Sequence, residues 1–60
     1  MITYDAIYYF RNGARIGAVR DYTDWDTVVS DAKMVRRENI NTEIQIIKRE
    51  DGSMSDFWQI

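Results

Sequence analysis

The sequence predicts a small α+β protein, in which one helix packs across one face of an antiparallel sheet in the order β-β-α-β-β. Two dipeptides, Asn12-Gly13 and Asp51-Gly52, are typical of tight hairpin turns. Between them, apolar residues recur at helical spacing. We expect residues 1–60 to form one domain, with a hairpin over 2–21, a helix over 24–38 and a second hairpin over 42–60.

The first predicted hairpin is apolar on both faces. With a two-residue turn, alternation places on one face Tyr4, Ala6, Tyr8, Phe10, Gly17 and Val19, and on the other Ile7, Tyr9, Ile16 and Ala18. A single helix covers one face, and the residues leave open which one it takes. The second face then meets another copy of the chain, a different protein or water.

Pairing across this hairpin depends on the turn. A two-residue turn sets Tyr8 opposite Gly17, and it also pairs Tyr9 with Ile16 and Asp5 with Arg20. A three-residue turn with a bulge is the alternative, and it would shift the register.

The predicted helix begins at Thr23-Asp24-Trp25-Asp26, a pattern typical of a capping box with Thr23 as the N-cap. One apolar stripe follows, made of Trp25, Val28, Val29, Ala32 and Val35. Asn39 is expected to end the helix in a left-handed conformation, with Ile40 packing back on the last turn.

The second hairpin leaves its last segment open. Residues 42–49 alternate as a strand should, whereas residues 53–60 form either a fourth strand or a tail. We favour the strand, because it avoids leaving two large aromatic side chains loose. A two-residue turn at Asp51-Gly52 pairs Phe57 with Ile46 and Trp58 with Gln45.

Composition argues against catalysis. The chain has no cysteine and no histidine, so it lacks the usual general base, the usual metal ligands and disulfides. Asp24 and Asp26 are two residues apart on a helix and do not face each other. We expect no catalytic residue, no metal site and no cofactor. Without a long apolar run or a leader pattern, a cytoplasmic protein with no membrane partner is expected.

Three groups are candidates for binding: the ring-bearing face with Tyr4, Tyr8 and Phe10; the helix start with Trp25 and Tyr22; and the basic helix end with Lys33, Arg36 and Arg37. Each has a plainer interpretation. The rings are typical of a core, and cations at a helix C-terminus complement the helix dipole. The net charge of −2 makes nucleic acid an unlikely partner.

The helix start Thr23-Asp24-Trp25-Asp26 and the strand Glu43–Lys48 are similar to those of the small uracil-DNA glycosylase inhibitors of Bacillus phages. That resemblance implies a homodimeric DNA mimic, produced during host takeover, that binds a DNA-repair enzyme. It implies that Trp25 helps to build a pocket for an apolar side chain of the enzyme. The second pocket aromatic falls on Val29, which departs from the pattern, and Asp51–Ile60 has no counterpart.

Our leading hypothesis is therefore a non-catalytic, homodimeric protein-interaction module that inhibits a host enzyme in the host cytoplasm. Its expected partner-binding residues are Trp25, Tyr22, Val29, Tyr4, Tyr8, Phe10, Asp24 and Asp26. The alternative is a small nucleic-acid-binding protein that uses Lys33, Arg36 and Arg37. Salt titration separates the two hypotheses. For a nucleic-acid binder, the logarithm of the affinity falls with the logarithm of the salt concentration, with a slope of roughly one for each phosphate contacted.

Overall fold

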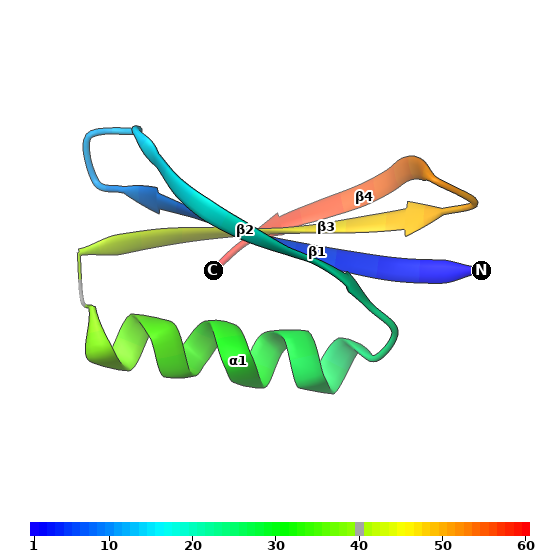
Figure 1. Cartoon of the computed structure of the whole chain (residues 1–60), viewed down its shortest axis with the longest axis horizontal. Coiled ribbons are helices and arrows are strands. Elements are labelled where there is room, and N and C mark those ends of the chain that lie inside the picture. Colours follow the sequence, from blue (N-terminus) through cyan, green and yellow to red (C-terminus); the bar gives the residue numbers. More distant parts are fainter. Residues whose placement is uncertain (40) are drawn as a thin grey trace.

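A computed structural model describes residues 1–39 and 41–60. The strands form one antiparallel sheet in the order β2-β1-β3-β4, and the helix lies between β2 and β3 in the sequence (Figure 1). This is the predicted α+β fold, and the last segment is a strand and not a tail. The elements are β1 (Ile2–Phe10), β2 (Arg15–Tyr22), α1 (Trp25–Glu38), β3 (Thr42–Glu50) and β4 (Ser53–Gln59).

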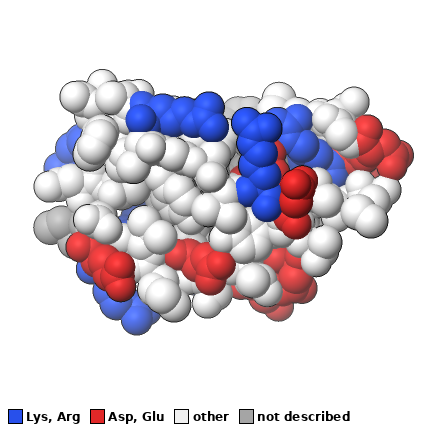
Figure 2. Space-filling view, in the orientation of Figure 1, with Lys and Arg blue, Asp and Glu red and all other residues white. Residues whose placement is uncertain are grey.

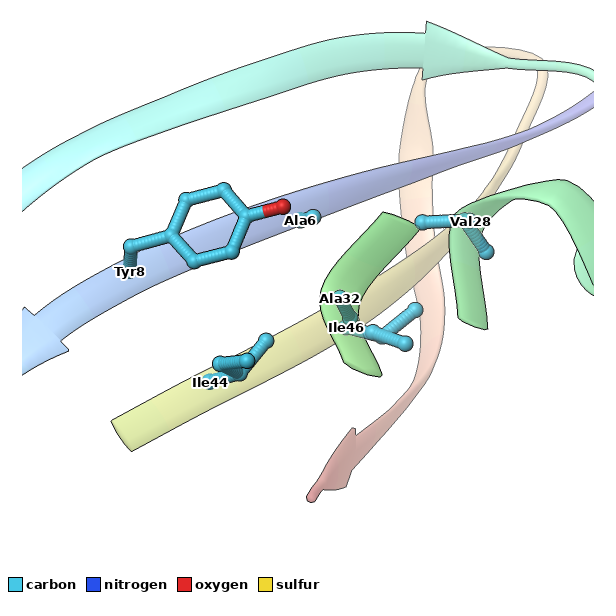
Figure 3. Close-up of a cluster of buried hydrophobic side chains, with 6 residues drawn as sticks. All are labelled: Ala6, Tyr8, Val28, Ala32, Ile44 and Ile46. Atoms are coloured by element: carbon cyan, nitrogen blue, oxygen red, sulfur yellow. The ribbon is translucent and has the colours of Figure 1, made fainter. Parts of the chain in front are cut away.

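The helix covers the face of the sheet that carries Tyr4, Ala6 and Tyr8, which settles the choice between the two hairpin faces. Successive side chains of a strand point to opposite faces of the sheet, so α1 meets only the even-numbered residues of β1 and β3. Figure 3 shows Val28 and Ala32 of α1 facing these strands. The buried core consists of Ala6, Tyr8, Val28, Ala32, Ile44 and Ile46.

The first turn is the three-residue alternative. The Phe10 carbonyl accepts from Gly13 N–H at 2.9 Å, the Phe10 N–H donates to Ala14 O at 2.8 Å, and Gly13 has φ +93°. A bulge at Ile16 then restores the expected register, so that Tyr8 still lies opposite Gly17. The predicted pairing of Tyr9 with Ile16 is wrong.

That bulge also moves one side chain to the other face. Tyr9 pairs with Arg15, and Ile16 lines a hollow with Tyr8 and Phe10 on the helix side of the sheet. Ile16 therefore does not share a face with Ile7, as a regular two-residue hairpin would require.

A second irregularity in β2 changes the partner of Asp5. Asp21 has φ +65°, and its N–H donates to the Asp5 carboxylate at 3.2 Å. The other Asp5 oxygen accepts from Arg49 Nε at 2.8 Å. Asp5 thus binds Asp21 and Arg49, and the expected cross-strand pair with Arg20 is replaced.

The helix and its N-cap both begin one residue later than predicted, at Trp25 and Asp24. Asp24 is the N-cap, and its carboxylate accepts from the N–H and the Oγ1 of Thr27, both at 2.9 Å. Thr23 does not cap the helix. At the other end Asn39 has φ −138°, so it is not left-handed, and its N–H donates to the carbonyls of Val35 and Arg36. Ile40 lies outside the described residues.

The second hairpin has the predicted turn and a different register beyond it. Asp51 and Gly52 have φ +52° and +86°, as a type I′ turn needs. Ser55 is an extra residue in β4, and its hydroxyl donates to the Lys48 carbonyl at 3.4 Å. Because one inserted residue inverts the alternation, the pairs become Ile46 with Trp58 and Ile47 with Phe57, and the predicted pairs are wrong.

Candidate interaction site

Three rings from three elements meet at the start of the helix. Trp25 is the first residue of α1, Tyr4 lies on β1 and Trp58 on β4. The Trp25 ring centroid lies 5.5 Å from that of Tyr4 and 4.7 Å from that of Trp58, and both contacts are edge-to-face. Quadrupoles of aromatic rings favour this geometry. We call Tyr4, Trp25 and Trp58 the aromatic cluster.

The aromatic cluster is held in place but not enclosed. Trp25 keeps 36% of its surface exposed and Trp58 keeps 37%. Tyr4 is half-buried and packs against the core, so the cluster is anchored from below. Large rings that are fixed on one side and open on the other are typical of the residues that dominate protein interfaces.

The surroundings of the aromatic cluster are mainly acidic. Asp26 is exposed in the first helical turn, and Asp24 is exposed although its carboxylate caps the helix. On the sheet, Lys48 of β3 pairs with Tyr4, and Asp56 lies opposite Lys48 on β4, two residues before Trp58. On the face drawn in Figure 2, Asp and Glu side chains lie over the helix and toward the right-hand end, whereas Lys and Arg side chains lie over the sheet and at the left-hand end of the helix.

Tyr22 is half-buried and bound to the helix, so its role is structural more than that of an exposed contact residue. Its hydroxyl donates to the Asp31 carboxylate of α1 at 2.9 Å. Burial, followed by the hydrogen bond to Asp31 and the charges of Asp31 and Tyr8, raises the pKa of Tyr22 to about 12. Burial, followed by the Asp31 charge, also raises the pKa of Tyr8. These tyrosines and Asp31 join the hairpin to the middle of the helix.

The structure divides the predicted partner-binding residues. Tyr4, Trp25, Asp24 and Asp26 lie together at the helix start. Val29 is half-buried against the core, and Tyr8 is part of the core. Phe10 is exposed at the far end of β1, beside a hollow of about 270 Å³ lined also by Ile16 and Val35.

Sequence reasoning missed Trp58 as a member of the site. The expected register placed its side chain on the other face of β4, away from Trp25. Only the bulge at Ser55 brings the two tryptophans together. No dipeptide near Ser55 is typical of a bulge. The sequence therefore contained no signal that Trp58 belongs to the site, apart from the presence of two adjacent aromatic residues, Phe57 and Trp58.

The basic helix end stays apart from the basic residues of β3. Lys33 and Arg37 are exposed on α1 and Arg36 is half-buried. Arg49 binds Asp5 on the opposite face of the sheet, and Lys48 pairs with Tyr4 toward the start of the helix. The five cations therefore do not form one surface.

The face of the sheet opposite the helix is a second candidate surface. We call it the open face, because among the described residues no element packs against it (Figure 1). From the pairing of the strands, it consists of Thr3, Asp5, Ile7, Tyr9, Arg15, Ala18, Arg20, Glu43, Gln45, Ile47, Arg49, Met54, Phe57 and Gln59.

Among residues 1–39 and 41–60, no group of three or more His, Cys, Asp or Glu side chains is arranged to hold a metal ion. In the same part of the chain, the helix is too short and too polar to cross a bilayer.

Comparison of the chain with protein-family models, with curated proteins and with solved structures finds no match.

Proposed function

We propose that this chain is a non-catalytic protein-interaction module that binds another protein through the aromatic cluster. The observation that carries the proposal is the exposure of Trp25 and Trp58, each about a third open although both are fixed by edge-to-face contacts. Ordering these rings costs little on binding, because the fold has already ordered them. The absence of histidine and cysteine from the sequence supports a role in binding and not in catalysis.

The chemistry around the aromatic cluster defines the partner. Asp26 follows Trp25 in the helix and Asp56 lies two residues before Trp58 on β4, so the rings have more acidic than basic neighbours, with Lys48 opposite Asp56. Such a surface complements a protein that presents an apolar side chain surrounded by Lys or Arg. A DNA-binding enzyme has basic surfaces of this kind, since it must neutralise phosphates. The proposal therefore extends to inhibition of a host DNA-repair enzyme, with uracil-DNA glycosylase as the first enzyme to test.

The test measures binding by calorimetry and inhibition of uracil excision by purified uracil-DNA glycosylase. The same protein serves as bait for capture from a host lysate, with each captured protein then titrated individually. The informative variant is Trp58→Ala, which removes an exposed ring at the edge of the sheet. Phe57→Ala is its matched control, because Phe57 is the next residue of β4 and faces the opposite side.

We expect Trp58→Ala to weaken binding at least about tenfold, which corresponds to about 1.4 kcal/mol. Phe57→Ala should bind as the wild type does. Circular dichroism spectra of both variants must match that of the wild type. Equal binding by wild type and Trp58→Ala, with both folded, would remove the aromatic cluster from the interface. Binding of the captured proteins without effect on uracil-DNA glycosylase would retain the module and reject that enzyme.

A further inference from the structure

In a single copy of the chain, the centre of the open face is apolar and exposed to solvent. Ile7 and Ile47, on the two central strands, are half-buried by their neighbours alone. Next to them on β4, Phe57 and Met54 are 55% and 58% exposed. A hollow of about 210 Å³ lies between Ile47, Met54, Phe57 and Gln45. Apolar side chains that line a hollow offer a place for the side chain of a partner.

The charges at the centre of the open face cancel each other. Asp5 is only 3% exposed, and its carboxylate is bound by Arg49 at 2.8 Å and by Asp21 N–H. The remaining charged residues lie at the margins, with Arg15 and Arg20 on the edge strand β2 and Glu43 near one end of β3. In a two-fold symmetric pair, residues near the axis meet their own copies, so a net charge at the centre of the face would oppose association and a neutral centre favours it.

We propose that two copies of this chain pack sheet against sheet through the open face. This surface lies across the sheet from the aromatic cluster, so the proposal does not depend on the function proposed above. In such a pair Ile7, Ile47 and Phe57 of each copy would be buried between the sheets, as in the inner layer of a β-sandwich. The helices would lie on the two outer sides, with both aromatic clusters accessible.

The size of the open face fits a small dimer interface. Four strands of about eight residues span about 26 Å by about 19 Å, which is about 500 Å² in projection. The accessible area exceeds the projected area, because side chains roughen the surface. Specific interfaces bury about 600–1,000 Å² per partner, so the face reaches the lower part of this range. We therefore expect a dimer that dissociates at roughly micromolar concentration.

The other ways to use this sheet are less well supported. A nucleic-acid platform needs neighbouring aromatic or guanidinium planes on the central strands. Here Tyr9 and Arg49 lie near opposite ends of β1 and β3, with Ile7 and Ile47 between them, and Arg49 is bound to Asp5. Side-by-side addition of strands is hindered at both edges, since β2 has irregularities at Ile16 and Asp21 and β4 has one at Ser55. Packing of a second copy against the open face requires neither a platform of stacking planes nor a regular free strand edge.

The test compares the dissociation constants of three forms of the chain by sedimentation, from roughly micromolar to roughly millimolar concentration. Phe57→Lys places a charge on the open face. Met34→Lys places the same charge on the helix, at a residue of nearly equal exposure (54% against 55%). We expect the wild type to dimerise, Phe57→Lys to raise the dissociation constant at least about tenfold, and Met34→Lys to leave it unchanged.

Amide NMR spectra recorded across the same dilution give an independent measurement. The signals of Ile7, Gln45, Ile47 and Phe57 should shift with concentration, whereas those of Val28 and Ala32 should stay constant. Met54→Lys is a second variant at an exposed position of the face, in case Phe57→Lys does not fold. A wild type that stays monomeric at millimolar concentration overturns the proposal. A dimer disrupted by Met34→Lys, or tight binding of single-stranded DNA lost in Phe57→Lys, does so as well.

Discussion

Trp58, near the end of the chain, packs edge-to-face on Trp25, the first residue of the helix, with ring centroids 4.7 Å apart and planes inclined at 64°. This contact joins the edge strand β4 to the helix, which also packs on the central strands and is bound to β2 through Tyr22 and Asp31. It therefore fixes the edge of the sheet and completes the aromatic cluster at the same time.

The coupling between the two tryptophans is measurable. Trp25→Ala should lower the free energy of unfolding by about 2–4 kcal/mol, less than for a fully buried ring, because 36% of the side chain is exposed. In a double-mutant cycle with Trp58→Ala, the interaction should amount to about 0.5–1.5 kcal/mol. Urea denaturation followed by far-ultraviolet circular dichroism measures all four proteins. Strictly additive effects would mean that the rings do not stabilise each other.

The N-cap assignment separates two neighbouring residues. Asp24→Ala should destabilise the protein by about 1 kcal/mol, because the N–H and hydroxyl of Thr27 lose their acceptor. Thr23→Ala serves as the control and should change stability by less than about 0.5 kcal/mol. Thermal or urea denaturation measures both. If Thr23→Ala proved the more damaging change, the capping box expected from the sequence would be correct after all.

Two glycines of the first hairpin should respond in opposite ways to alanine. Gly13 has φ +93°, where a Cβ is strained, so Gly13→Ala should cost about 1–2 kcal/mol. A Cβ on Gly17 meets nothing within 4 Å and the backbone there is ordinary, so Gly17→Ala should be neutral or stabilising by up to about 1 kcal/mol. Melting curves of the two variants give the answer. Equal melting temperatures would contradict the bulged turn.

Stability should fall at alkaline pH because of Tyr22. Its pKa rises from 10.0 to about 12 in the folded state, so the folded chain keeps a proton that the unfolded chain releases. This contribution is fully present below pH 10.0 and is lost as the pH rises to about 12. Tyr22→Phe should flatten that decline, although Tyr8 retains part of it. At neutral pH the variant should lose about 0.5–1.5 kcal/mol with the hydrogen bond to Asp31. Urea denaturation at several pH values measures both effects, and an unchanged alkaline decline would exclude Tyr22 as its source.

Local signals in the sequence determined the elements, their order and the fold class. Asn12-Gly13 and Asp51-Gly52 marked both turns, and a period of 3.6 in the apolar residues marked the helix. Alternation along β1 also showed that one helix leaves an apolar face behind. These features depend on backbone propensities and on the spacing of side chains, which are properties of residues close together in the sequence.

Register and site were decided by the tertiary structure. The bulges at Ile16 and Ser55 each move a side chain to the other face, and the second of them brings Trp58 to Trp25. Whether a strand accommodates an extra residue depends on which alignment packs best across the sheet and against the helix. That choice is a sum over contacts distant in the sequence, so no short stretch of residues contains it.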